Sequence, residues 1–154
     1  MNEHVDGQIG AVAALVRSTF LMNAVYSESA REFGLTQQQG QLLCVLMAQP
    51  YGMSELGAVL GLAKSSLTGL VDRTERNGLV QRKPDPQDSR AVRVALTRPG
   101  AKLAEEFYNE TCRRVDKLTS EFAPAERDTL AALLGRIVMD NKVPTVFMEP
   151  DQPH

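Results

Sequence analysis

The sequence of 154 residues has few of the residue types on which hydrolytic and metal-binding chemistry depends. It contains only two histidines, His4 and His154, and both lie close to a chain end, where a side chain is rarely held in place. A histidine-dependent catalytic triad needs a rigidly held imidazole, so this class of hydrolase is excluded. Cys-x-x-Cys, His-Glu-x-x-His and phosphate-binding glycine motifs are absent as well. We therefore expect no enzyme activity, no metal site and no cofactor.

Cysteine, aromatic residues and long apolar runs are also scarce. The two cysteines, Cys44 and Cys112, are too few for a disulfide framework and favour a reducing compartment. No apolar run approaches the roughly 20 residues of a membrane-spanning helix, and the first residues are polar and acidic, unlike a secretory signal. Tryptophan is absent and aromatic residues make up 5%, so no aromatic ligand cage is evident. We expect a cytoplasmic protein.

What the chain does contain is enough apolar sequence for one folded domain, with 43% hydrophobic and 23% charged residues. Apolar residues at three- and four-residue spacing, bounded by glycine, proline or a capping sequence, indicate helices. These predicted helices cover residues 8–33, 36–46, 54–60, 64–77, 99–121 and 124–138. The spacing changes to two after Gly78, which predicts strands over residues 79–83 and 91–96 with a Pro/Asp-rich turn between them.

The order of these elements is that of a winged helix-turn-helix: a short helix, a glycine turn, a longer helix and then a charged hairpin. The predicted fold is therefore mainly α with a small β-hairpin wing (α+β). A winged helix-turn-helix over residues 35–97 is flanked by N- and C-terminal dimerisation helices over residues 8–33 and 98–148. Residues 1–7 and 149–154 are expected to be disordered tails.

The helix over residues 64–77 has two dissimilar faces. Its apolar stripe consists of Leu67, Leu70, Val71 and Thr74. The residues on the other face near its N-terminus are small: Ser65, Ser66, Thr68 and Gly69. Small side chains let a recognition helix approach base edges in the major groove, and hydroxyls can bond to bases or phosphates. Arg73 and Arg76 lie further along the helix, where phosphate pairing is expected.

Positive charge is concentrated around this helix, although the whole chain has a net charge of -2. Residues 64–98 contain eight basic and four acidic side chains, a local net charge of +4. The basic residues are Lys64, Arg73, Arg76, Arg82, Lys83, Arg90, Arg93 and Arg98. Such a local cluster is the pattern of a phosphate-binding surface. From charge alone, an ordinary solvated helix and hairpin explains it equally well.

The sequence resembles the MarR family of bacterial transcriptional regulators over about residues 11–142. The most specific segment is Ser65-Ser66-Leu67-Thr68-Gly69-Leu70-Val71-Asp72-Arg73, followed by Asn77-Gly78-Leu79-Val80. Asp88-Ser89-Arg90 then matches the family's Asp-x-Arg wing motif, and Leu96-Thr97 matches the residues that close the second strand. Gly69 departs from the pattern, because family members often have arginine there, so base preference would rest on other residues.

The resemblance implies a homodimer that binds a pseudo-palindromic operator in double-stranded DNA and regulates transcription, as a repressor. The residues that would contact the major groove or its flanking phosphates are Ser65, Ser66, Thr68 and Arg73. Arg90 would enter the minor groove, with Asp88 orienting it or a neighbouring arginine. Ser54, which opens the preceding helix, would contact a phosphate. The complete set of predicted DNA-binding residues is Ser54, Lys64, Ser65, Ser66, Thr68, Gly69, Arg73, Arg76, Lys83, Asp88 and Arg90.

A physical argument also supports the predicted dimer. Two half-sites one helical turn apart require two reading heads related by two-fold symmetry. The first and last helices offer more apolar surface than a small head can cover, especially the Leu130–Val138 seam. The other interpretation is that these helices pack within one chain as a small bundle. Phe147 and Met148 could add to a dimer interface.

Three further hypotheses remain open. A small aromatic or anionic effector could end DNA binding, and the residues that could line its pocket are Arg17, Tyr26, Tyr51 and Tyr108. Cys112 could act as a redox sensor, because Arg113 and Arg114 follow it, whereas Cys44 lies in an apolar helix and fits an inert core thiol. Finally, the winged helix could be a protein–protein interaction module without DNA binding, since the hairpin turn carries acidic residues.

Overall fold

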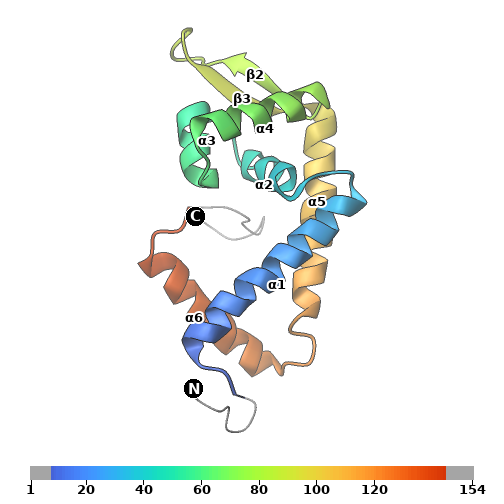
Figure 1. The fold of residues 1–154 in the computed structure, drawn as a ribbon, viewed down its shortest axis with the longest axis vertical. Coiled ribbons are helices and arrows are strands. Elements are labelled where there is room, and N and C mark those ends of the chain that lie inside the picture. Colours follow the sequence, from blue (N-terminus) through green and yellow to red (C-terminus); the bar gives the residue numbers. More distant parts are fainter. Residues whose placement is uncertain (1–7, 145–154) are drawn as a thin grey trace.

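The computed structural model describes residues 8–144, which form helices and one small antiparallel sheet at one end of the molecule (Figure 1). In chain order the elements are α1 (Ala11–Glu32), α2 (Gln37–Leu46), β1 (Tyr51–Gly52), α3 (Met53–Leu60), α4 (Lys64–Arg76), β2 (Val80–Pro84), β3 (Val92–Leu96), α5 (Arg98–Lys117) and α6 (Pro124–Asp140). The predicted fold, mainly α with a β-hairpin wing, is confirmed. The expected tails, and Phe147 and Met148 with them, lie outside the described residues.

Side-chain caps mark the starts of two helices, α2 and α5. The Gln39 backbone N–H donates to Thr36 Oγ1 at 3.1 Å, and the Gln39 side chain accepts from the Thr36 N–H at 3.0 Å, which completes the predicted capping box of α2. Thr97 caps α5, a role that the sequence analysis missed. Its hydroxyl accepts from the Gly100 N–H at 3.0 Å and donates to the Gly78 carbonyl at 2.6 Å. This single side chain therefore joins the start of α5 to the turn that follows α4.

The sheet contains one more strand than the sequence predicted. Its order is β1-β3-β2, and both neighbouring pairs are antiparallel. In β1, Tyr51 pairs with Val94 and Gly52 pairs with Arg93. Two residues are too few to give a recognisable alternation of apolar and polar side chains, so only the tertiary contact with β3 reveals this strand. β1 anchors the hairpin to the start of α3.

The core lies between α2, α4, α5 and the base of the sheet. The predicted apolar stripe of α4 is fully buried there, with Leu70 and Val71 at most 1% exposed. Phe107 of α5 is also fully buried, and its ring packs against Gly40 of α2 so closely that a Cβ on Gly40 would lie 2.6 Å from it. The winged helix-turn-helix is therefore held against α5 by tight packing rather than by a flexible link.

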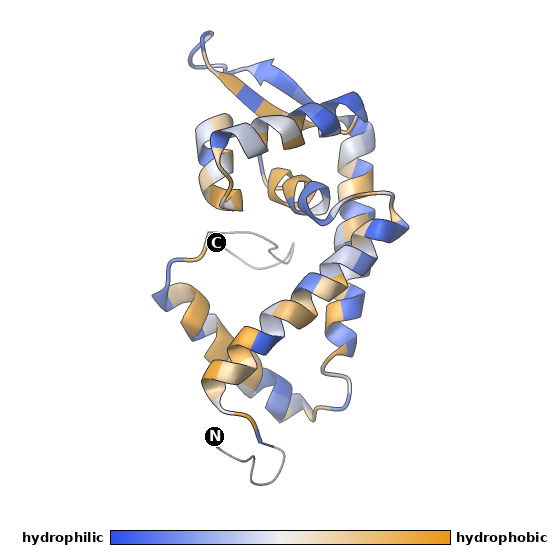
Figure 2. Ribbon diagram, in the orientation of Figure 1, coloured by the Kyte–Doolittle hydropathy of each residue, from blue (hydrophilic) through white to orange (hydrophobic). Residues whose placement is uncertain are grey.

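The N-terminal half of α1 and the whole of α6 extend away from this core (Figure 1). No residue of α6 is buried, and the apolar seam predicted there is open to solvent, with Leu133 53% and Ile137 42% exposed. On α1, Val12 and Phe20 are 78% and 71% exposed. Figure 2 shows these apolar stretches on both helices. Packing within a single chain thus leaves both faces uncovered.

Within residues 8–144, no helix has the length and apolar character needed to cross a membrane.

Candidate nucleic-acid interface

A sharp turn at Gly61 places α4 against α3. Gly61 has φ 66°, in the left-handed region that favours glycine. Its N–H and that of Leu62 both turn back to the Gly57 carbonyl, the latter at 3.0 Å, which ends α3. Leu56 of α3 and Leu67 of α4 are both buried in the common core. The two helices therefore form the expected helix-turn-helix with a fixed mutual orientation.

Burial of the apolar stripe turns the opposite face of α4 outward. Five of the predicted DNA-binding residues of this helix are exposed: Lys64, Ser65, Ser66, Arg73 and Arg76. The other two, Thr68 and Gly69, are half-buried. The Thr68 hydroxyl donates to the Lys64 carbonyl at 2.9 Å, so its oxygen remains available as an acceptor. At Gly69, an added Cβ would approach only the flexible Arg73 guanidinium, at 3.3 Å.

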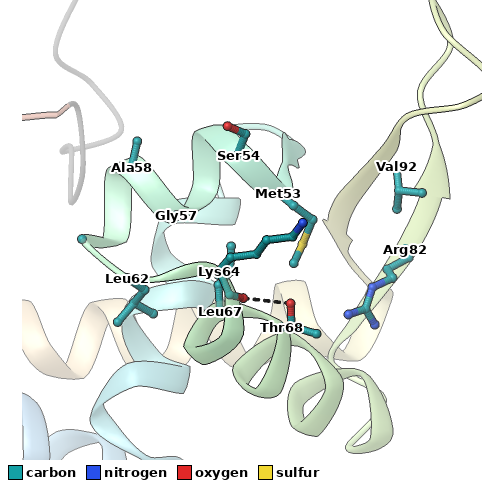
Figure 3. Close-up of a pocket in the computed structure, with 11 residues that line it drawn as sticks. Met53, Ser54, Gly57, Ala58, Leu62, Lys64, Leu67, Thr68, Arg82 and Val92 are labelled. Atoms are coloured by element: carbon teal, nitrogen blue, oxygen red, sulfur yellow. Dashed lines mark hydrogen bonds between the residues drawn. The ribbon is translucent and has the colours of Figure 1, made fainter.

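A hollow of about 940 Å³ lies between α3, the N-terminal half of α4 and the wing (Figure 3). It brings together three predicted site residues, Ser54, Lys64 and Thr68, from two helices. The structure adds lining residues that the sequence analysis had not selected: Met53, Leu62, Leu67, Arg82 and Val92. The hollow is therefore largely apolar, with hydroxyl and cationic groups at its edge. It lies on the same face of the molecule as the exposed side of α4.

The wing is a tight hairpin whose turn is held by its own aspartates. Asp85 accepts from the Gln87 backbone N–H at 2.8 Å and from Arg93 Nε at 3.1 Å. Asp88 was expected to hold and orient Arg90 or a neighbouring arginine, and it accepts from the Arg90 backbone N–H at 3.0 Å. This is the short-range bond that aspartate commonly makes in turns. The Arg90 guanidinium stays exposed at the wing, without a carboxylate partner among the described residues.

Most of the positive charge around α4 is not neutralised. Of the eight basic residues counted between positions 64 and 98, two form ion pairs with described carboxylates: Arg82 and Arg93. The six others have no carboxylate within ion-pairing distance among residues 8–144: Lys64, Arg73, Arg76, Lys83, Arg90 and Arg98. The arrangement leaves these cations available to an external polyanion.

Comparison with known proteins decides the family. A model of the MarR family matches residues 33–91. The multiple antibiotic resistance protein MarR of Salmonella typhimurium is 32% identical over 106 residues, which are 68% of this chain and 74% of that protein. The chain belongs to the MarR family.

A second relative and a solved structure are also similar to this chain. The HTH-type transcriptional regulator YkoM of Bacillus subtilis is 30% identical over 108 residues, 70% of either chain. The S. aureus MepR–DNA complex shares the fold, with a TM-score of 0.71 at 22% identity over 86% of this chain and 99% of that chain. The protein is a MarR-family transcriptional regulator with a winged helix-turn-helix.

The predicted effector-binding residues of this MarR-family chain do not line a common hollow among those described here. Tyr108 borders a second hollow of about 690 Å³ between α5 and α6, together with Cys112 and Leu134. Tyr26 and Tyr51 are half-buried against the core, and Arg17 is exposed on α1. Burial raises the pKa of Tyr26 to about 12, so this phenol stays protonated at neutral pH.

The two cysteines occupy different environments. Cys44 of α2 belongs to the buried core, and burial raises the pKa of its thiol to about 12. The thiolate, which is the reactive form, is therefore scarce at neutral pH. Cys112 of α5 is half-buried at the edge of the hollow between α5 and α6. Of the two, Cys112 is the more exposed.

Proposed function

We propose that this MarR-family protein represses transcription by binding, as a homodimer, to a pseudo-palindromic operator in double-stranded DNA. The observation that carries the proposal is the outward face of α4, where Ser65 and Ser66 are exposed beside unpaired cations while the opposite face is buried. Small hydroxyl residues let a helix approach base edges, and the cations supply phosphate contacts. Arg90, exposed at the wing, would enter the adjacent minor groove.

The uncovered apolar faces support the homodimer. Leu133, Ile137 and Val138 of α6 form a seam that the chain itself leaves 42–53% exposed, and Phe20 of α1 is more exposed still. Contiguous apolar surface of this kind marks an interaction site in a protein that carries charge elsewhere. A two-fold pairing of these helices would present two reading heads, as two half-sites require. The partner proposed for this surface is a second copy of the same chain.

Release by a small aromatic or anionic ligand completes the proposal. The hollow between α3, α4 and the wing has a volume of about 940 Å³, within the roughly 300–1,000 Å³ of small-molecule sites. Its apolar walls and the Lys64 ammonium group suit an amphipathic anion. A ligand there would compete with DNA directly, because the same residues border the proposed interface.

The central experiment is selection of bound duplexes from a random DNA pool, followed by fluorescence anisotropy with the selected operator. We expect saturable binding whose affinity falls steeply with salt, because counterions are released from the contacted phosphates. Affinity that does not change between low and moderate salt would contradict phosphate contacts. A protein that enriches no duplex but captures a folded protein partner would favour the interaction-module alternative.

The homodimer is tested separately by sedimentation equilibrium. Ile137→Ser removes apolar surface from the α6 seam and should shift the protein toward monomer. Arg136→Ser, a neighbouring change outside the apolar seam, should leave the association constant unchanged. Monomeric wild-type protein at micromolar concentration would refute the two-fold arrangement.

A further inference from the structure

Two carboxylates of α4 are bonded to one arginine of the wing. Arg82 Nη2 donates to Asp72 Oδ1 at 2.7 Å, and Arg82 Nη1 donates to Glu75 Oε1 at 2.8 Å. The Arg82 backbone N–H donates to the second oxygen of Glu75, at 2.9 Å. Asp72 and Glu75 lie three residues apart, on one side of the helix. We call these three residues the Arg82 clamp, and Figure 3 shows the Arg82 side chain reaching from the hairpin toward α4.

The Arg82 clamp lies further along the hairpin than the hydrogen bonds that hold the base of the hairpin. Near the base, the Leu79 N–H donates to the Thr74 carbonyl at 3.1 Å, and Thr97 bonds to the Gly78 carbonyl. These contacts fix where β2 begins. Arg82 acts in the middle of β2, so it constrains the direction in which the rest of the wing leaves α4.

Folding stability is a poor explanation for the clamp. The Arg82 side chain is 28% exposed, and those of Asp72 and Glu75 are 45% and 39% exposed. Ion pairs whose side chains are this exposed to solvent contribute little to folding stability, whereas the buried leucines beneath α4 contribute much more. A planar guanidinium bonded to two carboxylates does, however, impose a defined geometry.

The clamp is also unfavourable for simple attraction to DNA. It places two negative charges on α4, on the same helix as the proposed contacts Ser65 and Arg73, and only one positive charge compensates for them. Phosphates would be repelled by the excess negative charge. Removing the carboxylates should therefore strengthen DNA binding if attraction alone matters.

We infer that Arg82, held by Asp72 and Glu75, is a positioning residue that sets the angle between the wing and α4, so that Arg90 and the N-terminus of α4 reach the same operator. This inference rests on the proposed DNA-binding function. Without the clamp, the wing can move relative to α4, and the contacts of the two elements no longer form together. Operator binding then weakens, while sequence-independent attraction to phosphates does not.

The double variant Asp72→Asn/Glu75→Gln separates these possibilities by the sign of its effect. We expect its affinity for the selected operator to fall by about tenfold, the size of one lost base-specific contact. Its affinity for a random-sequence duplex should stay unchanged or rise, because two negative charges are gone. Operator affinity that is unchanged, or that rises along with random-duplex affinity, would overturn the inference.

Two comparisons make the test specific to the clamp. Glu55→Gln removes an exposed carboxylate of α3 that forms no ion pair among the described residues, so operator affinity should not fall. Arg82→Lys keeps the positive charge but cannot bond to both carboxylates, so operator affinity should fall although the net charge is unchanged. An Arg82→Lys protein with wild-type operator affinity and wild-type thermal stability would also overturn the inference. If the wild-type protein binds no duplex, the proposed function fails; if it binds and these variants bind equally well, only the clamp fails.

Discussion

The hydroxyls of Ser29 and Thr111 lie 2.7 Å apart in a contact between α1 and α5 from which solvent is fully excluded. Each is the other's buried hydrogen-bond partner, across 82 residues of sequence. Beside them, Arg114 of α5 pairs with Glu32 of α1 at 2.6 Å. This junction connects the helix that carries the winged head to the helix that carries the proposed dimer surface.

Removing both hydroxyls of this pair should cost less than the sum of removing each one alone. Ser29→Ala leaves the Thr111 hydroxyl buried without this partner, and we expect a loss of about 1–3 kcal/mol in the free energy of unfolding. Adding Thr111→Val removes the remaining polar group, so the double variant should be less destabilised than the sum of the two single changes. Urea unfolding of all four proteins at one concentration measures this coupling. Strict additivity would mean that the bond contributes nothing specific.

Gly100 should tolerate no side chain. A Cβ at this position would lie 1.8 Å from the Leu79 carbonyl oxygen, which is backbone and cannot move aside cheaply. We expect Gly100→Ala to destabilise the protein by about 3 kcal/mol or more. Gly69→Ala is the matched control, because only the mobile Arg73 guanidinium is near and alanine is the better helix former by about 1 kcal/mol. Equal melting temperatures for the two variants would contradict the close approach of α5 to the hairpin base.

Acid should weaken the fold partly through Glu110. Hydrogen bonds from Arg113 and Arg114 lower the pKa of this carboxyl from 4.5 to about 2. Since the folded-state pKa is the lower one, the stabilisation is present above pH 4.5 and is lost as the pH falls toward 2. Glu110→Gln should therefore show a shallower loss of stability over this range than the wild type. Identical acid-unfolding curves would indicate that the two arginines do not hold Glu110 in its charged form.

Arg90→Ala should separate binding from folding. The side chain is exposed at the wing, so we expect the free energy of unfolding to change by no more than about 0.5 kcal/mol. Operator affinity at moderate salt should fall strongly, because a guanidinium in the minor groove is lost. Arg98→Ala removes the same charge from the start of α5 and should weaken operator binding far less. Unchanged operator affinity in the Arg90 variant would count against wing insertion.

The cysteines should differ in reactivity toward a thiol reagent. At pH 8 the Cys44 thiol is buried and, with a pKa of about 12, protonated, so we expect it to react only after unfolding. Cys112 should react in the folded protein. Counting labelled thiols by mass spectrometry, before and after denaturation, gives one and then two. Rapid labelling of both cysteines in the native state would contradict the packing of α2. In a separate test, a Cys112→Ser protein that still loses DNA on peroxide treatment would exclude Cys112 as the redox sensor.

Much of the local structure can be predicted from the sequence alone. The spacing of apolar residues in the helices, the Thr36 capping box and the buried stripe of α4 all depend on residues within a turn or two of one another. Such patterns can be recognised in the sequence. The winged order of elements and the Asp88-x-Arg90 motif are local as well. The exposed hydroxyls near Ser66 follow directly from the burial of Leu67 and Leu70.

The rest depends on which distant segments meet. β1 exists only because Tyr51 and Gly52 pair with β3, and the Gly100 contact arises only where α5 passes the hairpin base. Charge counting treated Arg82 as one more free cation, but folding pairs it with Asp72 and Glu75. Local residue patterns were therefore enough to predict the helices, the wing and the chemical character of the exposed face of α4. Which charges are neutralised and how the wing is held could be seen only in the folded chain, because ion pairs and backbone contacts depend on distances in space that no local pattern encodes.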